Sequence, residues 1–144
     1  MTRRGTRARA VSRRDVLKTG ALATAGASVF VVDDEFDRVV YVVTAGEMGQ
    51  AIGPDGARVK RLEETIGRGV ELVEDASTAE AFVANALAPA AVYNVTISEN
   101  GDVVAYVEVD HADKGVAIGT DGRNIRAAKL LAERHYGVDD IQLT

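Results

Sequence analysis

The sequence predicts an α+β fold made of two similar units in tandem. A six-residue segment at positions 51–56 returns with small changes at positions 117–122, which is 66 positions later. Around each copy, β-branched runs typical of strands alternate with segments whose apolar residues recur at helical spacing. The length of 144 residues is sufficient for two small domains, each with a modest core.

The composition limits the kind of protein. Apolar residues make up 47% of the chain but aromatic residues only 5%. The cores must therefore rest on Val, Ala, Leu and Ile, and aromatic platforms for base stacking are not expected. The chain has no Cys, which excludes disulfides, thiolate metal ligands and cysteine nucleophiles. Only His111 and His135 could serve as imidazoles, so we expect no enzyme, no cofactor and no metal site.

The charge is distributed unevenly along the chain. Residues 1–27 hold seven of the 17 basic residues and one of the 22 acidic residues. Residues 28–144 hold the other 10 basic and 21 acidic residues, a formal charge of −11. Such an acidic body repels nucleic acid at long range unless salt screens it, and the screening length falls to about 3 Å at 1 M salt. The charge therefore predicts a halophilic source.

The first 27 residues allow two interpretations. Residues 1–11 look like a disordered basic arm. The twin arginine Arg13-Arg14, the weakly apolar run 19–27 and its ending Ala25-Gly26-Ala27 resemble a twin-arginine export signal. This run is too short and too weakly apolar to span a membrane, which takes about 20 residues. The alternative is a divergent first helix that packs beside the next segment.

Strands and helices follow in the same order in both halves. In the second half, Ser77 is the predicted N-cap of a helix, with Glu80 completing a capping box. Asn100-Gly101 predicts a hairpin turn. The predicted strands are 28–32, 38–43, 70–73, 92–98, 103–109 and 140–143, and the predicted helices are 45–52, 57–66, 78–87, 112–118 and 123–136.

The repeated turn has the parts that a clamp on a nucleic-acid backbone needs. A glycine at each end permits unusual backbone angles and lets a phosphodiester chain approach closely. The helix that follows presents free N–H groups to phosphate. Basic residues begin each of these helices: Arg58, Lys60 and Arg61 in the first copy, and Arg123 and Arg126 in the second.

Taken together, these features resemble KH domains, and residues 28–144 are similar to the tandem-KH archaeal NusA-like transcription termination factors. The resemblance implies two bacterial-type (type II) KH domains, each a three-stranded sheet backed by helices. Their predicted limits are 28–75 and 76–144, after a basic segment at 1–27. The stretches that carry the resemblance are 39–43, 46–53, 87–90, 104–109 and 117–125.

The resemblance also implies a function. A KH domain binds about four nucleotides of single-stranded RNA, with its Gly-x-x-Gly loop on the backbone and the bases in an apolar groove. We therefore expect a cytoplasmic RNA-binding protein of transcription termination or antitermination, with RNA polymerase as a further partner and without a membrane or small-molecule ligand. The groove walls would be Ile52, Val59, Ile118 and Ile125, which are expected mainly as core residues. The predicted RNA-binding residues are Gly53, Pro54, Asp55, Gly56, Arg58, Lys60, Arg61, Gly119, Thr120, Asp121, Gly122, Arg123 and Arg126.

Both loops depart from a typical RNA-binding loop. Asp55 and Asp121 stand where a basic residue would help most, and Pro54 removes one N–H donor. The first loop is therefore expected to bind weakly or to position the second. Two alternatives stay open: a KH-fold module that binds proteins without RNA affinity, and an exported protein with a twin-arginine signal.

The remaining polar residues have plainer interpretations. The acidic groups at 33–35 and 139–140 are predicted to be solvated turn acids rather than metal or acid-base sites. His111 is expected on the surface, and His135 in a last helical turn where the dipole favours a cation. In the helical stripe of Arg126, Lys129 and Arg134, only Arg126 is expected to face RNA. The tyrosines Tyr41, Tyr93 and Tyr106 are expected to pack in sheets.

Overall fold

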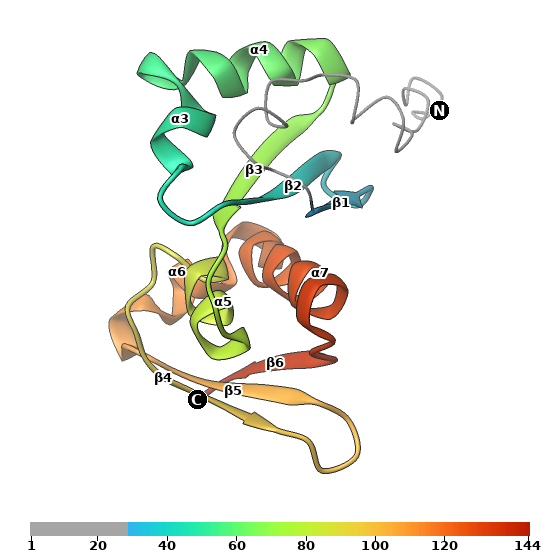
Figure 1. Cartoon of the computed structure of the whole chain (residues 1–144). Helices are drawn as coiled ribbons and strands as arrows, with labels where there is room; N and C mark the ends of the chain where they lie inside the picture. Colours follow the sequence, from blue (N-terminus) through green and yellow to red (C-terminus); the bar gives the residue numbers. More distant parts are fainter. Residues whose placement is uncertain (1–28) are drawn as a thin grey trace.

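The computed structural model describes residues 29–144, which form two three-stranded sheets of identical topology (Figure 1). In each sheet the first two strands are antiparallel and the third lies parallel to the second. The first sheet consists of β1 (Val29–Asp33), β2 (Arg38–Val43) and β3 (Gly69–Glu74), and the second of β4 (Val92–Ser98), β5 (Val104–Val109) and β6 (Asp140–Leu143). The α+β prediction is confirmed.

The helices also repeat. In both units a short helix, a 3-10 turn and a longer helix stand between the second and third strands. The first unit has α3 (Met48–Ile52), the turn Pro54–Gly56 and α4 (Ala57–Ile66). The second unit begins with α5 (Ala79–Ala86) and has η2 (His111–Asp113), α6 (Lys114–Ile118), the turn Thr120–Gly122 and α7 (Arg123–Tyr136).

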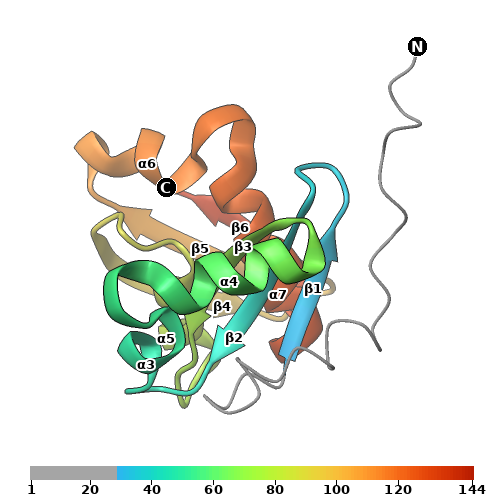
Figure 2. The same cartoon turned by 90° about the horizontal axis from the view of Figure 1, so that it is seen from above.

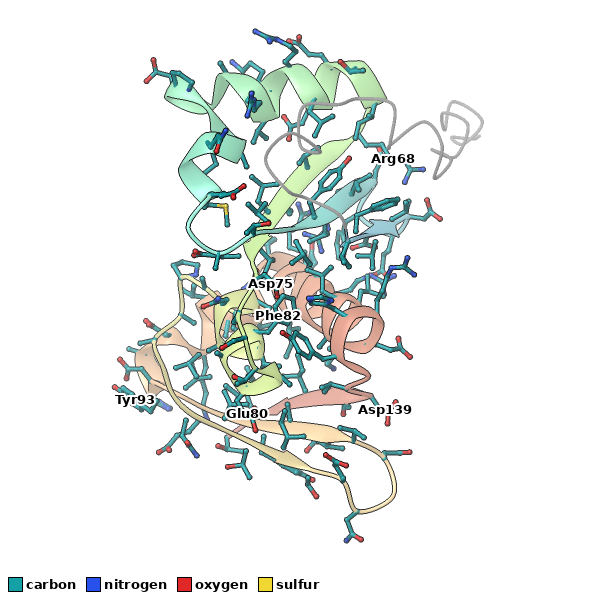
Figure 3. The ribbon with its side chains drawn as sticks, viewed as in Figure 1. Arg68, Asp75, Glu80, Phe82, Tyr93 and Asp139 are labelled. Carbon is teal, nitrogen blue, oxygen red and sulfur yellow. The ribbon has the colours of Figure 1, made fainter. Side chains whose placement is uncertain are left out.

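The two units stack in four layers. In Figure 1, α3 and α4 cover one side of the first sheet, and α5 and α7 lie between the two sheets. All six residues of β2 are buried, because helices pack on both of its faces. Its Val39 and Val43 join a core with Leu62 of α4, while Val40 joins a second core with Phe82 of α5. Figure 3 shows Phe82 within this middle helix layer.

The second sheet has one covered face. Along β5, the buried residues Ala105, Val107 and Val109 alternate with the exposed Tyr106 and Glu108. This alternation is typical of an antiparallel pair with one face in water. The two sheets thus have the same strand order but different burial.

Hydrogen bonds and ion pairs connect the two units. Asp33, at the end of β1, is buried, and its carboxylate accepts hydrogen bonds from Arg38 Nε at 3.0 Å and from Arg126 Nε of α7 at 2.9 Å. Burial alone would raise the pKa of Asp33, but the hydrogen bonds from Arg126 and Arg38 outweigh it and hold the pKa below its usual value. His135 Nε2 lies 3.0 Å from Asp75 Oδ1 at the junction between the units.

The prediction that the acidic groups are solvated turn acids is therefore wrong in part. Asp33 is 1% exposed and serves as a buried ionic link. Asp34 is exposed but lies 2.9 Å from Nη1 of the buried Arg68. Asp139 is exposed and accepts a hydrogen bond from the N–H of Val103 at 2.8 Å.

Three helix starts also differ from the sequence prediction. The helix predicted from residue 112 begins as α6 at Lys114, after η2. The N-cap of α5 is Thr78, whose hydroxyl accepts from Ala81 N–H at 3.1 Å, and not Ser77, so the capping box with Glu80 is absent. The helix predicted from residue 45 begins at Met48. Gly46 has a φ of 85° and donates its N–H to the carboxylate of Glu74 at 2.8 Å, which holds that segment in a turn.

The basic arm and the export-like segment, residues 1–27, lie outside the described residues. Within residues 29–144, no helix is long and apolar enough to cross a membrane.

Candidate nucleic-acid interface

The two Gly-x-x-Gly loops have the same backbone conformation. The first glycine of each, Gly53 and Gly119, has φ near 80° and ψ near 169°, a region open almost only to glycine. A Cβ on Gly119 would lie 2.8 Å from Asn124 Cβ, and one on Gly53 would lie 2.7 Å from Arg58 Cβ. The first glycine is therefore required by both the backbone angle and the close packing of the next helix.

The backbone conformation at the third loop position explains why both loops have an aspartate there. Asp55 and Asp121 have φ values of 54° and 56°. Among residues other than glycine, Asp and Asn adopt this left-handed conformation most readily. The two aspartates therefore remove positive charge from the loops, as expected, but they also suit the backbone of the turn.

The residue two positions after each loop ties the flanking helices together. Arg58 donates from Nη1 to the carbonyl of Gln50 at 3.0 Å. Asn124 donates from Nδ2 to the carbonyl of Ala117 at 3.1 Å. Each side chain thus bridges from the longer helix back to the shorter one, which fixes the loop between them. Lys60 and Arg61 are exposed on α4.

An apolar groove lies beside the first loop. It has a cavity volume of ≈ 570 Å³ and runs between α3, the loop, α4 and β3. Ile52, Val59 and Leu72 are among its lining residues, with Lys60 and Asp55 at its polar side. Ile52 and its counterpart Ile118 are 37% and 42% exposed, so the expectation that they are core residues is wrong.

A smaller hollow of ≈ 350 Å³ lies beside the second loop. Gly122, Ile125 and Lys129 line it from the loop and α7. Its opposite wall comes from Glu35 and Phe36, in the turn between β1 and β2 of the first unit. The second loop therefore faces a hollow that both units build.

The predicted basic residues of the second unit contact the first unit. The guanidinium carbon of Arg123 lies 4.8 Å from the centre of the Phe36 ring. Arg126 forms ion pairs with Asp33 at 2.9 Å and Glu35 at 3.0 Å. The positive charge of Arg126 is thus already balanced by carboxylates, while Arg123 remains exposed beside the loop.

Three residues that were not predicted as part of the site, Phe36, Arg38 and Asp33, lie at the turn that meets the second loop. The available signal was the run Asp-Asp-Glu-Phe-Asp-Arg, in which one aromatic residue interrupts a charged turn. Among residues 29–144, no group of three or more His, Asp or Glu side chains is placed to hold a metal ion. His111 is exposed in η2.

Comparisons with known proteins identify the two units. A model of the KH domain matches residues 14–79, and a model of the NusA-like second KH domain matches residues 79–143. The crystal structure of APE1850 has a TM-score of 0.80 and 29% sequence identity, and the match covers 93% of this chain and 100% of that one.

Curated relatives agree with these matches. A "Probable transcription termination protein NusA" of Halobacterium salinarum is 73% identical over 108 residues, which are 75% of this chain and 78% of that protein. A protein of the same name from Halococcus morrhuae is 61% identical over 113 residues, covering 78% of this chain and 80% of the relative. The repeated sheets, the two matched loops and these relatives show that the chain belongs to the family of archaeal NusA-like proteins with tandem KH domains.

Proposed function

We propose that this protein binds single-stranded RNA and acts in transcription termination or antitermination in the cytoplasm, with RNA polymerase as a partner. The observation that carries the proposal is the shared geometry of the two Gly-x-x-Gly loops, each beside a groove. An RNA backbone fits against the glycine face of such a loop, and the bases fit in the groove. The names of the curated relatives from halophilic archaea support the part in transcription termination.

The proposed site consists of both loops and the exposed cations next to them. Gly53 to Gly56 with Lys60 and Arg61 form the first half, and Gly119 to Gly122 with Arg123 form the second. Arg58 and Arg126 belong to the site mainly through the contacts that shape it, since both side chains already have partners. We propose that the boundary between the two domains lies between residues 75 and 79.

The basic N-terminal segment is proposed to belong to the first KH domain. The KH-domain model matches from residue 14, so it includes most of the export-like run. This match supports a cytoplasmic protein over an exported one. Mass spectrometry of the native protein tests the assignment: a chain that begins near residue 28 would contradict it.

Titration of the whole protein with fluorescent single-stranded RNA of about ten nucleotides, enough for two KH domains, tests RNA binding. Binding is measured by anisotropy at low KCl and at about 2 M KCl, where charge repulsion is screened. Thr120→Asp adds a carboxylate to the exposed loop and should weaken binding, because it repels the phosphates of the RNA backbone. Asp121→Asn removes one while keeping a residue that accepts positive φ, and it should strengthen binding.

Asp102→Asn is the matched control, because Asp102 is exposed at the far β4–β5 turn and its change alters the net charge equally. Its affinity should equal that of the unchanged protein. Absence of binding at both salt concentrations would refute the RNA-binding proposal and leave a KH-fold module that binds proteins.

A further inference from the structure

We infer that Phe36 of the first unit and Arg123 of the second form a stacking platform for one base of the RNA at the second loop. The inference rests on the proposed function and adds a residue outside the KH loop. Arg123 follows Gly122 directly, so its side chain stands next to the proposed backbone clamp. Its guanidinium carbon lies 4.8 Å from the Phe36 ring centre, a distance that permits a cation–π contact.

Further contacts hold the platform in place. Arg38 also approaches the Phe36 ring, at 5.2 Å, and its guanidinium donates to the carbonyl of Arg123. Arg38 is itself buried and paired with Asp33. The turn that carries Phe36 is therefore anchored to the start of α7, and little side-chain freedom is left to lose when a base stacks. Flat guanidinium and aromatic surfaces are the usual stacking partners of unpaired RNA bases.

The first loop lacks this arrangement. The residue in the position of Arg123 is Ala57, which has no guanidinium. The groove beside the first loop is closed by Val70, Glu71 and Leu72 of its own β3. Only the second loop, within residues 29–144, has an aromatic ring from the other unit in its wall. The platform is thus a difference between two loops that have the same backbone conformation.

The charge of the second hollow indicates which part of the RNA enters it. Its charged lining residues are the acids Glu35, Asp121, Glu133 and Asp139 and the bases Arg126 and Lys129. Both bases are already paired with carboxylates, whereas Glu133 and Asp139 are exposed. Carboxylates repel a phosphate but accept hydrogen bonds from exocyclic amino groups, as Asp and Glu do from cytosine N4. We therefore expect a base rather than a phosphate in this hollow, and cytosine or adenine in preference to uracil, which has no amino group.

A tryptophan reporter tests the stacking directly. The chain contains no Trp, so Phe36→Trp in the full-length protein places a single indole in the platform. Single-stranded oligo(C) or oligo(A) should quench its fluorescence, and oligo(U) should do so more weakly. The control is Tyr93→Trp, on the outer part of β4 where Tyr93 is 66% exposed, and its fluorescence should not change. Figure 3 shows Tyr93 at one end of the second sheet.

Affinities give the second measurement. Phe36→Ala should weaken RNA binding about 5- to 100-fold, as expected for the loss of one stacked base. Phe36→Tyr should bind RNA with the affinity of the unchanged protein, because it keeps the aromatic ring. Thermal unfolding of each variant separates loss of the platform from loss of the fold, and Phe36→Tyr keeps the test valid should Phe36→Ala unfold.

The outcomes separate this inference from the proposed function. Weaker binding by Thr120→Asp, together with unchanged binding by Phe36→Ala and unquenched Phe36→Trp, would overturn the platform and leave the RNA-binding function intact. Equal quenching by oligo(C), oligo(A) and oligo(U) would overturn the preference for amino-bearing bases. Absence of RNA binding by the unchanged protein would overturn the proposed function itself.

Discussion

The buried carboxylate of Asp33 joins the two units. It binds one arginine of its own unit and one of the other, Arg38 and Arg126. This link could not be predicted from the sequence, because Arg126 is 93 positions away and turn acids are usually solvated. What singles out Asp33 is its place at the end of β1, where Arg126 of α7 reaches it from the other unit, and that follows only from the packing of the units.

We predict that Asp33→Asn lowers the free energy of unfolding by about 3 kcal/mol, because the buried Arg38 loses its anionic partner. Urea unfolding at pH 7 provides the measurement. Asp102→Asn is the control, since the same chemical change at an exposed turn should stay within about 0.5 kcal/mol. Equal stabilities of the two variants would show that the ionic link contributes nothing.

The link also predicts a pH dependence. The pKa of Asp33 is lower in the folded protein than its usual value of 3.8. A depressed carboxyl pKa stabilises the fold above the unfolded-state pKa, and this contribution is lost as the pH falls through the folded-state pKa. The difference in urea midpoint between the unchanged protein and Asp33→Asn should therefore be full at pH 7 and shrink below about pH 4. A difference that stays constant into acid would contradict this assignment.

At the scale of elements, local signals predicted α4 and α7 with the limits that the structure shows. Each begins after a Gly-x-x-Gly turn and ends before a glycine of positive φ, Gly67 or Gly137. The start of α3 was less predictable, because a contact with Glu74, 28 positions away, decides it. The loop conformation was predicted only in part: glycine pairs suggested unusual angles, but not the positive φ of Asp55 and Asp121.

We predict unequal costs for alanine at the two glycines of the second loop. Gly122→Ala places Ala at a φ of 78° in open space and should cost about 1–2 kcal/mol. Gly119→Ala should cost about 3 kcal/mol or more, because its backbone region is barred to Ala and its Cβ would meet Asn124 at 2.8 Å. Thermal unfolding measures both. Equal losses would mean that Asn124 moves aside without cost.

At the scale of the whole molecule, the order of the layers sets the stability. The run Val39-Val40-Tyr41-Val42-Val43 is apolar on both faces, as in a strand covered on both sides, whereas β5 alternates. The apolar run thus predicts that the first sheet is covered on both faces. It does not predict which helices cover it, since a helix from either unit would satisfy the pattern. Figure 2, seen from above, shows α4 and α7 on the two sides of this sheet.

We predict that both units unfold in one transition, because Val40 and Val42 of the first sheet share a core with Phe82 and Leu131 of the second unit. Val40→Ala should lower stability by about 1–3 kcal/mol. Hydrogen exchange measured by mass spectrometry should show equal loss of protection in β2 and β5.

Val116→Ala is the control for this experiment, since Val116 is 45% exposed in α6. It should leave the exchange of both strands almost unchanged. Faster exchange confined to β2 in the Val40→Ala variant would show that the units unfold separately.

The shared helix layer has a consequence for any ligand that reaches both loops. Two units joined by a flexible linker could change their relative positions, but here the units share a core, so α3 and α6 keep fixed places in one body (Figures 1 and 2). Once one loop holds a strand, the neighbouring nucleotides are offered to the other loop at an effective concentration set by the protein. The gain in affinity from binding both loops then depends on the number of nucleotides between the two bound tracts. Two tracts with the wrong spacing gain no avidity, even if each of them fits its own loop.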